Sequence, residues 1–420
     1  MGMNRRHFLQ AGAAGIAAGL AGCADMPGMA PKARVAVVGG GYGGATAAKY
    51  IRMLDPAIEV VLIEPNEAFV SCPISNLVLG GFKTMADITT PYDGLVGHGV
   101  KVVRDTATAI DVDKKQVRLM RGDAVAFDRV IVSPGVDFMW EALPAMGGAD
   151  AQGKVLHAWK AGPQTAALRR QLEAMKDGGV YVLSIPEAPY RCPPGPYERA
   201  CQVAAYFKAA KPRSKVLLLD ANADVTSKGP LFKKAWTELY KDIVEYRGNS
   251  KAVDVDVRGG AVKLEFGDVK GDVLNVLPPM KAGNVAAPFI TANKRWCEVD
   301  WLTYESKAVK GVHVLGDSLQ IAPAMPKSGS MANAHGKVCA AAVVALLNGQ
   351  APNGAPTIIN TCYSMVSDKL AIHVTSVHKY DEKDRTMKAV PGGGVSAAMN
   401  EAEGAYTMNW AKNIWADALG

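Results

Sequence analysis

Residues 34–44 read RVAVVGGGYGG, an apolar, β-branched run that leads directly into a glycine-rich loop. The run predicts a buried parallel strand, and the loop fits the pattern GxGxxG. Residues 45–54 then predict a helix, and residues 59–64 predict a second strand that ends in an acid, Glu64, 20 residues beyond Gly44. Strand, loop, helix, strand and terminal acid in this order predict a dinucleotide-binding unit.

Each glycine of the loop has a different role in such a unit. Gly39 permits the tight turn, Gly41 lets the backbone approach a pyrophosphate, and Gly44 lets helix and strand pack closely. The helix N-terminus offers free N–H groups to the phosphates, and Glu64 would accept hydrogen bonds from ribose hydroxyls. The alternative is a glycine-rich turn without a nucleotide, and the loop alone does not distinguish FAD from NAD.

Two later segments favour FAD. Residues 127–135 predict a strand that closes in a small-residue turn, and residues 312–317 predict a strand that ends in Gly316 and Asp317. Both resemble FAD proteins of the glutathione reductase type, in which that Asp binds the ribitol. A helix expected over 330–342 would direct its N-terminus at the flavin and stabilise negative charge there. The FAD domain is therefore expected to be discontinuous, built from residues 31–150 and 280–355.

Residues 151–279 are expected to form a second Rossmann-like domain without a dinucleotide loop. Strands are predicted at 180–185 and 215–220. Where a second GxGxxG should follow the first of these strands, the sequence reads PEAPYRCPP, residues 186–194. Prolines remove the N–H donors that a pyrophosphate needs, so NAD(P)H is not expected to bind here in the usual way.

The predicted fold is therefore α/β, with two Rossmann-like three-layer domains of the glutathione reductase type and a C-terminal α+β domain. The last domain, residues 356–420, is expected to hold an antiparallel sheet of three or four strands. A helix predicted over 408–418 would close this sheet. It carries Trp410, Ile414 and Trp415, whose spacing favours packing on its own domain.

The first 30 residues have the pattern of an export signal. Residues 4–10, NRRHFLQ, form a twin-arginine pattern, and residues 11–21 are a short Ala/Gly-rich apolar segment. This predicts a periplasmic protein. LAGC, which ends at Cys23, resembles a lipobox, so a lipid anchor at Cys23 is one outcome and cleavage by an ordinary signal peptidase near Ala30 is the other.

Composition excludes several other classes. The net charge of +7 is mild, and no Lys/Arg block is interleaved with aromatic residues, so nucleic acid is not expected to bind. No internal run of about 20 apolar residues predicts a membrane span. The seven cysteines form no CxxC and no CxxCH, so neither a metal site nor a covalently attached haem is expected on this chain.

The most specific stretch is YRCPPGPYE, residues 190–198. Together with SCPISN at 71–76, the Gly-Asp pair at 316–317 and NTCYS at 360–364, it resembles the flavoprotein subunit of flavocytochrome c sulfide dehydrogenase. That family lies among the disulfide-reductase-like flavoproteins that include sulfide:quinone reductases. The resemblance covers nearly the whole chain after the signal.

The resemblance implies roles for individual residues. Cys192 and Cys362 would form a redox-active disulfide over the flavin, and Glu198 would handle protons near the sulfur; the alternative for Glu198 is a surface charge that opens a helix. Cys72 matches the position at which some members attach FAD covalently, the alternative being a noncovalent thiol. No chemical role is expected for Cys201, on one face of the helix after the motif, or for Cys297, beside Trp296. Cys339 is expected in the core, and His335 is a candidate contact to substrate or cofactor.

The function implied is an exported FAD enzyme that oxidises sulfide to persulfide, polysulfide or sulfur through the disulfide. Electrons would pass to a c-type cytochrome, with the haem on that partner chain. One alternative is a sulfide:quinone reductase-like enzyme. The other is a non-catalytic periplasmic flavoprotein partner of sulfur oxidation, which would be expected to have a broken cysteine pair.

Overall fold

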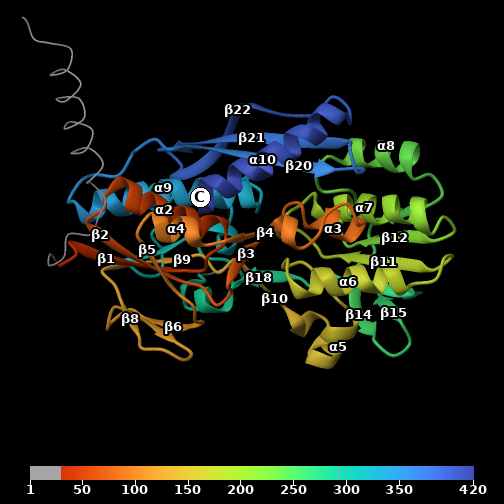
Figure 1. Cartoon of the computed structure of the whole chain (residues 1–420), viewed down its shortest axis with the longest axis horizontal. Coiled ribbons are helices and arrows are strands. Elements are labelled where there is room, and N and C mark those ends of the chain that lie inside the picture. The colour runs from red at the N-terminus through yellow and green to blue at the C-terminus, as the bar shows by residue number, and fades with distance from the viewer. Residues whose placement is uncertain (1–29, 292) are drawn as a thin grey trace, which may run out of the picture. The chain divides into compact units, whose positions relative to one another are not determined.

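The glycine-rich loop directly follows the central strand of a five-stranded parallel sheet (Figure 1). The computed structural model describes residues 30–291 and 293–420, so the expected export signal and Cys23 lie outside the described residues. The strand order is β19 (Val312–Val314), β9 (Arg129–Val132), β1 (Ala33–Val38), β2 (Ile58–Ile63) and β5 (Val100–Val103). One sheet therefore combines strands from two distant parts of the sequence.

Two helices pack against each other beside this sheet, α2 (Tyr42–Leu54) and α9 (Gly329–Leu347). They approach closely because glycines face each other: a Cβ atom added at Gly336 would lie 2.6 Å from the carbonyl oxygen of Gly43. By length and composition alone α9 is apolar enough to cross a membrane. In the structure it is a core helix, with Met331, Cys339 and Val343 fully buried.

A second parallel sheet has the order β13 (Val244–Arg247), β12 (Lys215–Asp220), β11 (Val180–Ile185) and β17 (Val273–Val276). Its helices are α6 (Pro163–Ala174), α7 (Gly195–Ala210) and α8 (Gly229–Leu239). Helix α7 begins five residues before the expected start at Ala200. Pro196 lies in its first turn, where the missing N–H of proline costs no helical hydrogen bond.

The C-terminal segment forms an antiparallel sheet of β20 (Thr357–Met365), β21 (Ala371–Asp381) and β22 (Thr386–Val395), followed by α10 (Glu401–Leu419). Strand β20 contacts both α9 and α7, so it bridges the helices of the two parallel sheets (Figure 1, blue). Helix α10 starts seven residues before the expected Met408, because the Asn400 side chain caps it by accepting from the Glu403 N–H at 2.8 Å.

Smaller elements complete the described chain. The short sheets pair β3 (Ala68–Val70) with β4 (Thr89–Pro91), β10 (Val136–Phe138) with β18 (Met280–Ala282), β6 (Ala107–Asp111) with β7 (Gln116–Leu119) and β8 (Val125–Ala126), and β14 (Ala252–Asp256) with β15 (Ala261–Leu264) and β16 (Gly267–Lys270). The short helices are α3 (Ser75–Gly80), α4 (Asp93–Gly97) and α5 (Ala149–Lys154).

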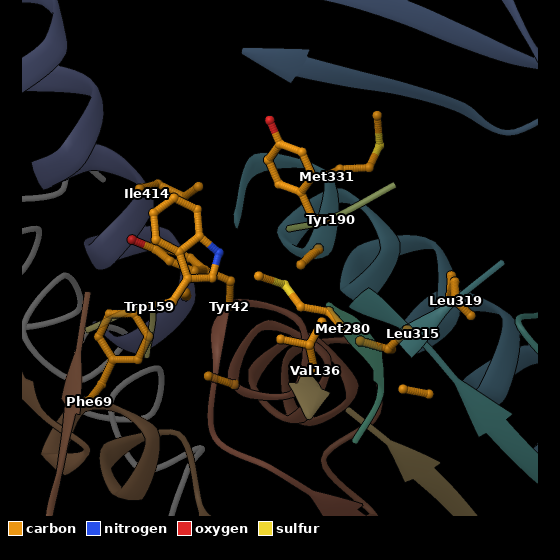
Figure 2. Close-up of a cluster of buried hydrophobic side chains, with 14 of the residues drawn as sticks. Tyr42, Phe69, Val136, Trp159, Tyr190, Met280, Leu315, Leu319, Met331 and Ile414 are labelled. Atoms are coloured by element: carbon orange, nitrogen blue, oxygen red, sulfur yellow. The ribbon is translucent and has the colours of Figure 1, made fainter. Parts of the chain in front are cut away.

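Residues Ala33–Gly420 form one compact unit. A single hydrophobic cluster includes Val35 of β1, Tyr181 of β11 and Ile358 of β20, so the three main sheets share a core. Figure 2 shows three members of this cluster, Tyr42, Phe69 and Trp159, gathered close together; all three also line the cavity described below. The α/β class predicted from the sequence is confirmed.

Candidate active site

A cavity of about 360 Å³ runs from the glycine-rich loop to the cysteine motif. Nine of the residues proposed from the sequence for catalysis or cofactor binding line it, whereas Gly44 and His335 do not: Gly39, Gly41, Glu64, Cys72, Cys192, Glu198, Gly316, Asp317 and Cys362. The structure thus brings together residues that are far apart in the sequence. Some directly follow strands β1, β2 and β19, and others lie in α7 and β20.

The glycine-rich loop has the geometry of a nucleotide cradle. Gly39 has φ +98°, and a Cβ atom there would lie 2.4 Å from the carbonyl oxygen of Ser133. A Cβ atom at Gly44 would lie 1.9 Å from the carbonyl oxygen of Gly39, whereas a Cβ atom at Gly41 would meet nothing within 4 Å. Gly41 therefore presents bare backbone to the cavity, where a pyrophosphate can approach.

Glu64 holds this loop as well as facing the cavity. One carboxylate oxygen accepts from the Gly40 N–H at 2.7 Å, and the other accepts from the backbone and side-chain nitrogens of Asn66 at 2.9 and 2.6 Å. Because Glu64 is only 7% exposed, these bonds fix its carboxylate at the edge of the cradle.

Asp317 supplies another acceptor to the cavity. No hydrogen bond to its carboxylate is present among the described residues, and burial raises its pKa although Arg191 and Lys327 oppose that shift. Behind it, Ser328 caps α9 by accepting from the Met331 N–H at 3.0 Å, and the first residues of α9 line the cavity. A carboxylate without a partner and a helix N-terminus fit the ribitol and the electron-rich end of a flavin.

Cys192 lies in the turn after β11 in a strained conformation. Its φ of 59° falls in the left-handed region, which is uncommon for a residue other than glycine and clusters at functional sites. The backbone holds it there: its N–H donates to the Lys327 carbonyl at 2.8 Å, and its own carbonyl accepts from the Gly195 N–H at 2.9 Å. A Cβ atom at Gly195 would lie 2.8 Å from the Cys192 sulfur, so this glycine makes room for the sulfur.

Cys362 faces the same cavity from β20, 170 residues further along the chain. Its thiol donates to Oδ1 of Asn360 at 3.3 Å. None of the six described cysteines is joined in a disulfide, so the pair is seen in its dithiol form. Burial raises the pKa of both thiols, and the nearby Cys362 raises the pKa of Cys192 further.

Glu198 lies in the first turn of α7 and is 7% exposed, so its interpretation as a surface charge is wrong. Oε1 accepts from the Met365 N–H at 2.9 Å, and Oε2 accepts from Nδ2 of Asn76 at 3.0 Å. Burial raises the pKa of Glu198. A carboxyl group that is fixed, desolvated and close to two thiols is suited to proton transfer.

Cys72 lies at another part of the cavity wall, in reach of two donors. Nη2 of Arg191 lies 3.5 Å from its sulfur, and the backbone N–H of Ala161 lies 3.3 Å from it. The sulfur also lies 3.9 Å from the carbonyl oxygen of Trp159, so these three contacts hold it at the cavity wall.

Two further side chains were missed by the sequence analysis. Arg199, 2% exposed, donates to Oδ1 of Asn76 at 3.0 Å, to Oδ1 of Asn275 at 2.8 Å and to the carbonyls of residues 157 and 158. It follows Glu198 directly, so the motif itself was its only sequence signal. The second is Lys228, which has no such signal.

His335 does not line the cavity, so its candidate role in contacting substrate or cofactor is wrong. It is buried in α9, where its ring lies 5.1 Å from the ring of Tyr304. Cys339, expected in the core, is fully buried, and Cys201 and Cys297, for which no chemical role was expected, are fully buried as well.

Comparisons with known families agree with this geometry. Residues 165–278 match the family model for the central part of the sulfide dehydrogenase [flavocytochrome c] flavoprotein chain. Residues 354–419 match the flavin-binding part of flavocytochrome c sulphide dehydrogenase, and residues 33–173 match the pyridine nucleotide-disulphide oxidoreductase family. The FAD that these families imply fits the glycine cradle and the Asp317 wall.

Two individual proteins are similar in sequence to this chain. The chain is 67% identical over 45 residues to a sulfide dehydrogenase [flavocytochrome c] flavoprotein chain of Chlorobaculum thiosulfatiphilum, covering 11% of this chain and 94% of that sequence. It is 25% identical over 302 residues to the mitochondrial sulfide:quinone oxidoreductase of Mus musculus, covering 67% of this chain but only 65% of the mouse protein.

A solved structure, the sulfide:quinone oxidoreductase from Aquifex aeolicus, superposes with a TM-score of 0.74 at 16% identity, covering 92% of this chain and 91% of that one. This likeness extends the shared fold over nearly the whole chain. The chain therefore belongs to the family of flavoprotein chains of flavocytochrome c sulfide dehydrogenase, FAD-binding oxidoreductases related to the sulfide:quinone oxidoreductases.

Proposed function

We propose that this chain oxidises sulfide through a redox-active disulfide between Cys192 and Cys362 and passes the electrons to a c-type cytochrome. The observation that carries the proposal is that both cysteines and Glu198 line the cavity that also holds the FAD cradle. A sulfide oxidant needs an electrophilic sulfur beside an electron acceptor, and this cavity offers both.

The cysteine pair and Glu198 have different roles in this reaction. Hydrosulfide attacks one sulfur of the disulfide, forms a new S–S bond to it, and releases the other sulfur as a thiolate. A second hydrosulfide takes the outer sulfur away as a disulfane anion, loses its proton to Glu198, and leaves both cysteines as thiolates. Glu198, fixed by Met365 and Asn76, holds the proton that the second sulfide loses. FAD, when bound, supplies a two-electron acceptor that can return electrons singly to a one-electron carrier.

We further propose that Cys72 attaches FAD covalently. The assignment is supported by the position of the Cys72 sulfur, which lines the cavity within reach of donors from Arg191 and Ala161. A denaturing gel tests it: a flavin-fluorescent band at the protein's mass is expected, and it disappears in Cys72→Ser. An unfluorescent wild-type band refutes the thioether.

Export through the twin-arginine signal and a periplasmic location remain part of the proposal, with a lipid anchor at Cys23 as one of its two processing outcomes. Mass spectrometry of the mature N-terminus distinguishes them: a lipidated Cys23 supports the anchor, and a peptide starting near Pro31 excludes it.

The deciding experiment is an anaerobic titration with sulfide in which the flavin absorbance is followed. Bleaching is expected in the wild type and in Cys201→Ala, a buried control on α7 that does not line the cavity, and it is expected to be lost in Cys192→Ser and Cys362→Ser. Full bleaching in Cys192→Ser overturns the disulfide mechanism. No bleaching in the wild type supports the alternative of a non-catalytic flavoprotein.

The electron acceptor needs its own test, because the fold is shared with sulfide:quinone oxidoreductases. The reduced enzyme is mixed with oxidised c-type cytochrome or with a soluble quinone analogue. Rapid, salt-sensitive reduction of the cytochrome supports the proposal, whereas rapid reduction of the quinone alone supports the sulfide:quinone reductase-like alternative.

A further inference from the structure

A buried lysine behind the cysteine pair has no part in the mechanism above. Lys228 lies just before α8, is 8% exposed, and has a φ of 56°, in the left-handed region. None of the ion pairs among the described residues includes it. A buried ammonium without a carboxylate partner is costly, and a strained backbone adds to that cost, so this position is a candidate for a functional role.

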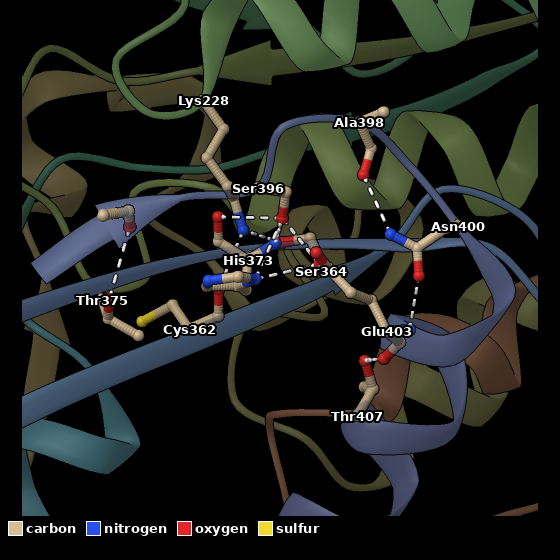
Figure 3. Close-up of polar contacts among 11 residues, drawn as sticks. Lys228, Cys362, Ser364, His373, Thr375, Ser396, Ala398, Asn400, Glu403 and Thr407 are labelled. Carbon is tan, nitrogen blue, oxygen red and sulfur yellow. Dashed lines mark hydrogen bonds and ion pairs between the residues drawn. The ribbon is translucent and has the colours of Figure 1, made fainter.

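The Lys228 ammonium is bound to the strand that carries Cys362. Nζ donates to the carbonyl oxygen of Cys362 at 3.0 Å and to Oγ of Ser364 at 2.8 Å, as Figure 3 shows. Alternate side chains of a strand share a face, so the side chains of Ser364 and Cys362 point to the same side of β20. The ammonium therefore lies on the sulfur side of the strand.

Four titratable groups face Lys228 from the elements packed around it: Cys362 on β20, Cys192 in the turn after β11, Glu198 on α7 and Glu403 on α10. The two carboxyl groups already have other partners. Glu198 is bound by Met365 and Asn76, and Glu403 lies 3.0 Å from Nδ1 of His373 and accepts from Ser396. The cysteines are the groups that gain a negative charge during turnover.

We propose that Lys228 is a positioning residue that makes Cys362 the leaving thiolate, and thereby directs sulfide to Cys192. This inference rests on the proposed function. In the step concerned, a bond forms between the hydrosulfide sulfur and Sγ of Cys192. The Cys192–Cys362 bond breaks, and its electron pair stays on Sγ of Cys362. The products are a Cys192 persulfide and a Cys362 thiolate beside the ammonium, with the net charge conserved.

The direction of attack follows from leaving-group chemistry. Thiol–disulfide exchange is faster when the departing sulfur has the lower pKa, and the Lys228 ammonium is hydrogen-bonded to the strand that carries Cys362. Among the described residues, no hydrogen bond joins the Lys228 ammonium to the turn that carries Cys192, so the geometry favours Cys362 as the departing sulfur.

Two measurements on the holoenzyme test this inference. In the first, oxidised enzyme receives one equivalent of sulfide without oxygen, is quenched with iodoacetamide, and is digested for mass spectrometry. The persulfide is expected on the Cys192 peptide in the wild type and in Lys233→Met, an exposed control on α8. In Lys228→Met the persulfide is expected to be shared between Cys192 and Cys362.

The second measurement follows the alkylation rate of Cys362 against pH in a Cys192→Ser background. Adding Lys228→Met is expected to raise the apparent pKa of Cys362 by about one unit and to slow alkylation about tenfold at pH 8. Lys228→Arg, which keeps the charge, is expected to restore most of the rate. Ser364→Ala removes one partner of the ammonium and is expected to shift the profile in the same direction, by less.

The outcomes separate the two proposals. If no persulfide forms on either cysteine of the wild type, the proposed function fails. If a persulfide forms on Cys362 in the wild type, or if the alkylation profile is the same with and without Lys228→Met, the role of Lys228 fails while the disulfide mechanism stands. If Lys228→Met does not accumulate as folded protein, an unchanged profile in Ser364→Ala refutes the role.

Discussion

Replacing Lys228 with methionine is expected to stabilise the protein near neutral pH and to destabilise it at high pH. Burial lowers the pKa of Lys228 from 10.5 to about 8. The folded protein therefore holds the proton less tightly than the unfolded chain, which costs stability below pH 8 and costs nothing above pH 10.5. Methionine has nearly the same length and no charge, so the variant removes this cost.

The magnitude follows from the size of the shift. A difference of about 2.5 pKa units corresponds to about 3 kcal/mol of lost stability in the wild type at pH 7. The variant leaves the hydroxyl of Ser364 and the carbonyl oxygen of Cys362 without their ammonium partner, a combined loss of about 1–2 kcal/mol at every pH. The net expectation is a variant about 1–2 kcal/mol more stable than the wild type at pH 7, and less stable by a similar amount at pH 10.5.

The assay is urea unfolding of the holoenzyme, followed by tryptophan fluorescence, at several values between pH 7 and pH 10.5. Other titrating groups are common to both proteins and cancel in the difference between them. A stability difference that stays constant over this range contradicts the assignment of Lys228 as a buried ammonium. The control is Lys233→Met, whose side chain is exposed: its stability difference from the wild type is expected to stay constant over this pH range.

Three other predictions concern the cradle and the motif. Gly44→Ala is expected to abolish FAD incorporation, because its Cβ atom would lie 1.9 Å from the Gly39 carbonyl oxygen, whereas Gly41→Ala is expected to fold and to weaken FAD binding only; absorbance of the purified variants checks both. Arg199→Met is expected to lower stability by about 3–5 kcal/mol in urea unfolding, because it leaves several buried acceptors without their donor. Glu198→Gln is expected to slow sulfide-dependent flavin reduction about a hundredfold and to flatten its pH profile, measured by stopped flow, since the carboxyl group is no longer there to titrate.

The nucleotide cradle was predictable because its signal is local. Strand, glycine loop and helix follow one another within residues 33–54. Neighbouring backbone atoms exclude a side chain at Gly39 and Gly44, and Gly41 presents bare backbone to the cavity. The starts of α7 and α10 were placed too late for a different reason. Proline and glycine at 193–196 suggest a turn, and Asn400, which caps α10 by accepting from the Glu403 N–H, was not used as a helix start.

The meeting of Cys192 with Cys362 could not be derived from spacing, and in the sequence it rested on family resemblance alone. The same holds for Lys228, whose partners lie more than 130 residues away on β20. Long-range pairing of this kind leaves no periodicity in the local sequence, so only the assembled sheets reveal it. Glu198 was found in the motif, but its burial depends on Met365 and Asn76, which come from distant elements.

The late position of β20 has a consequence for biosynthesis. Cys362 lies 170 residues beyond Cys192, so that whole stretch must leave the ribosome before the two cysteines can meet. A route that threads the chain unfolded into an oxidising compartment would deliver Cys72, Cys192, Cys201, Cys297 and Cys339 first, free to pair with one another. Translocation of the finished fold would avoid these wrong disulfides, because Cys201, Cys297 and Cys339 are by then buried in the core. Among the described cysteines, that leaves Cys72, Cys192 and Cys362 at the cavity.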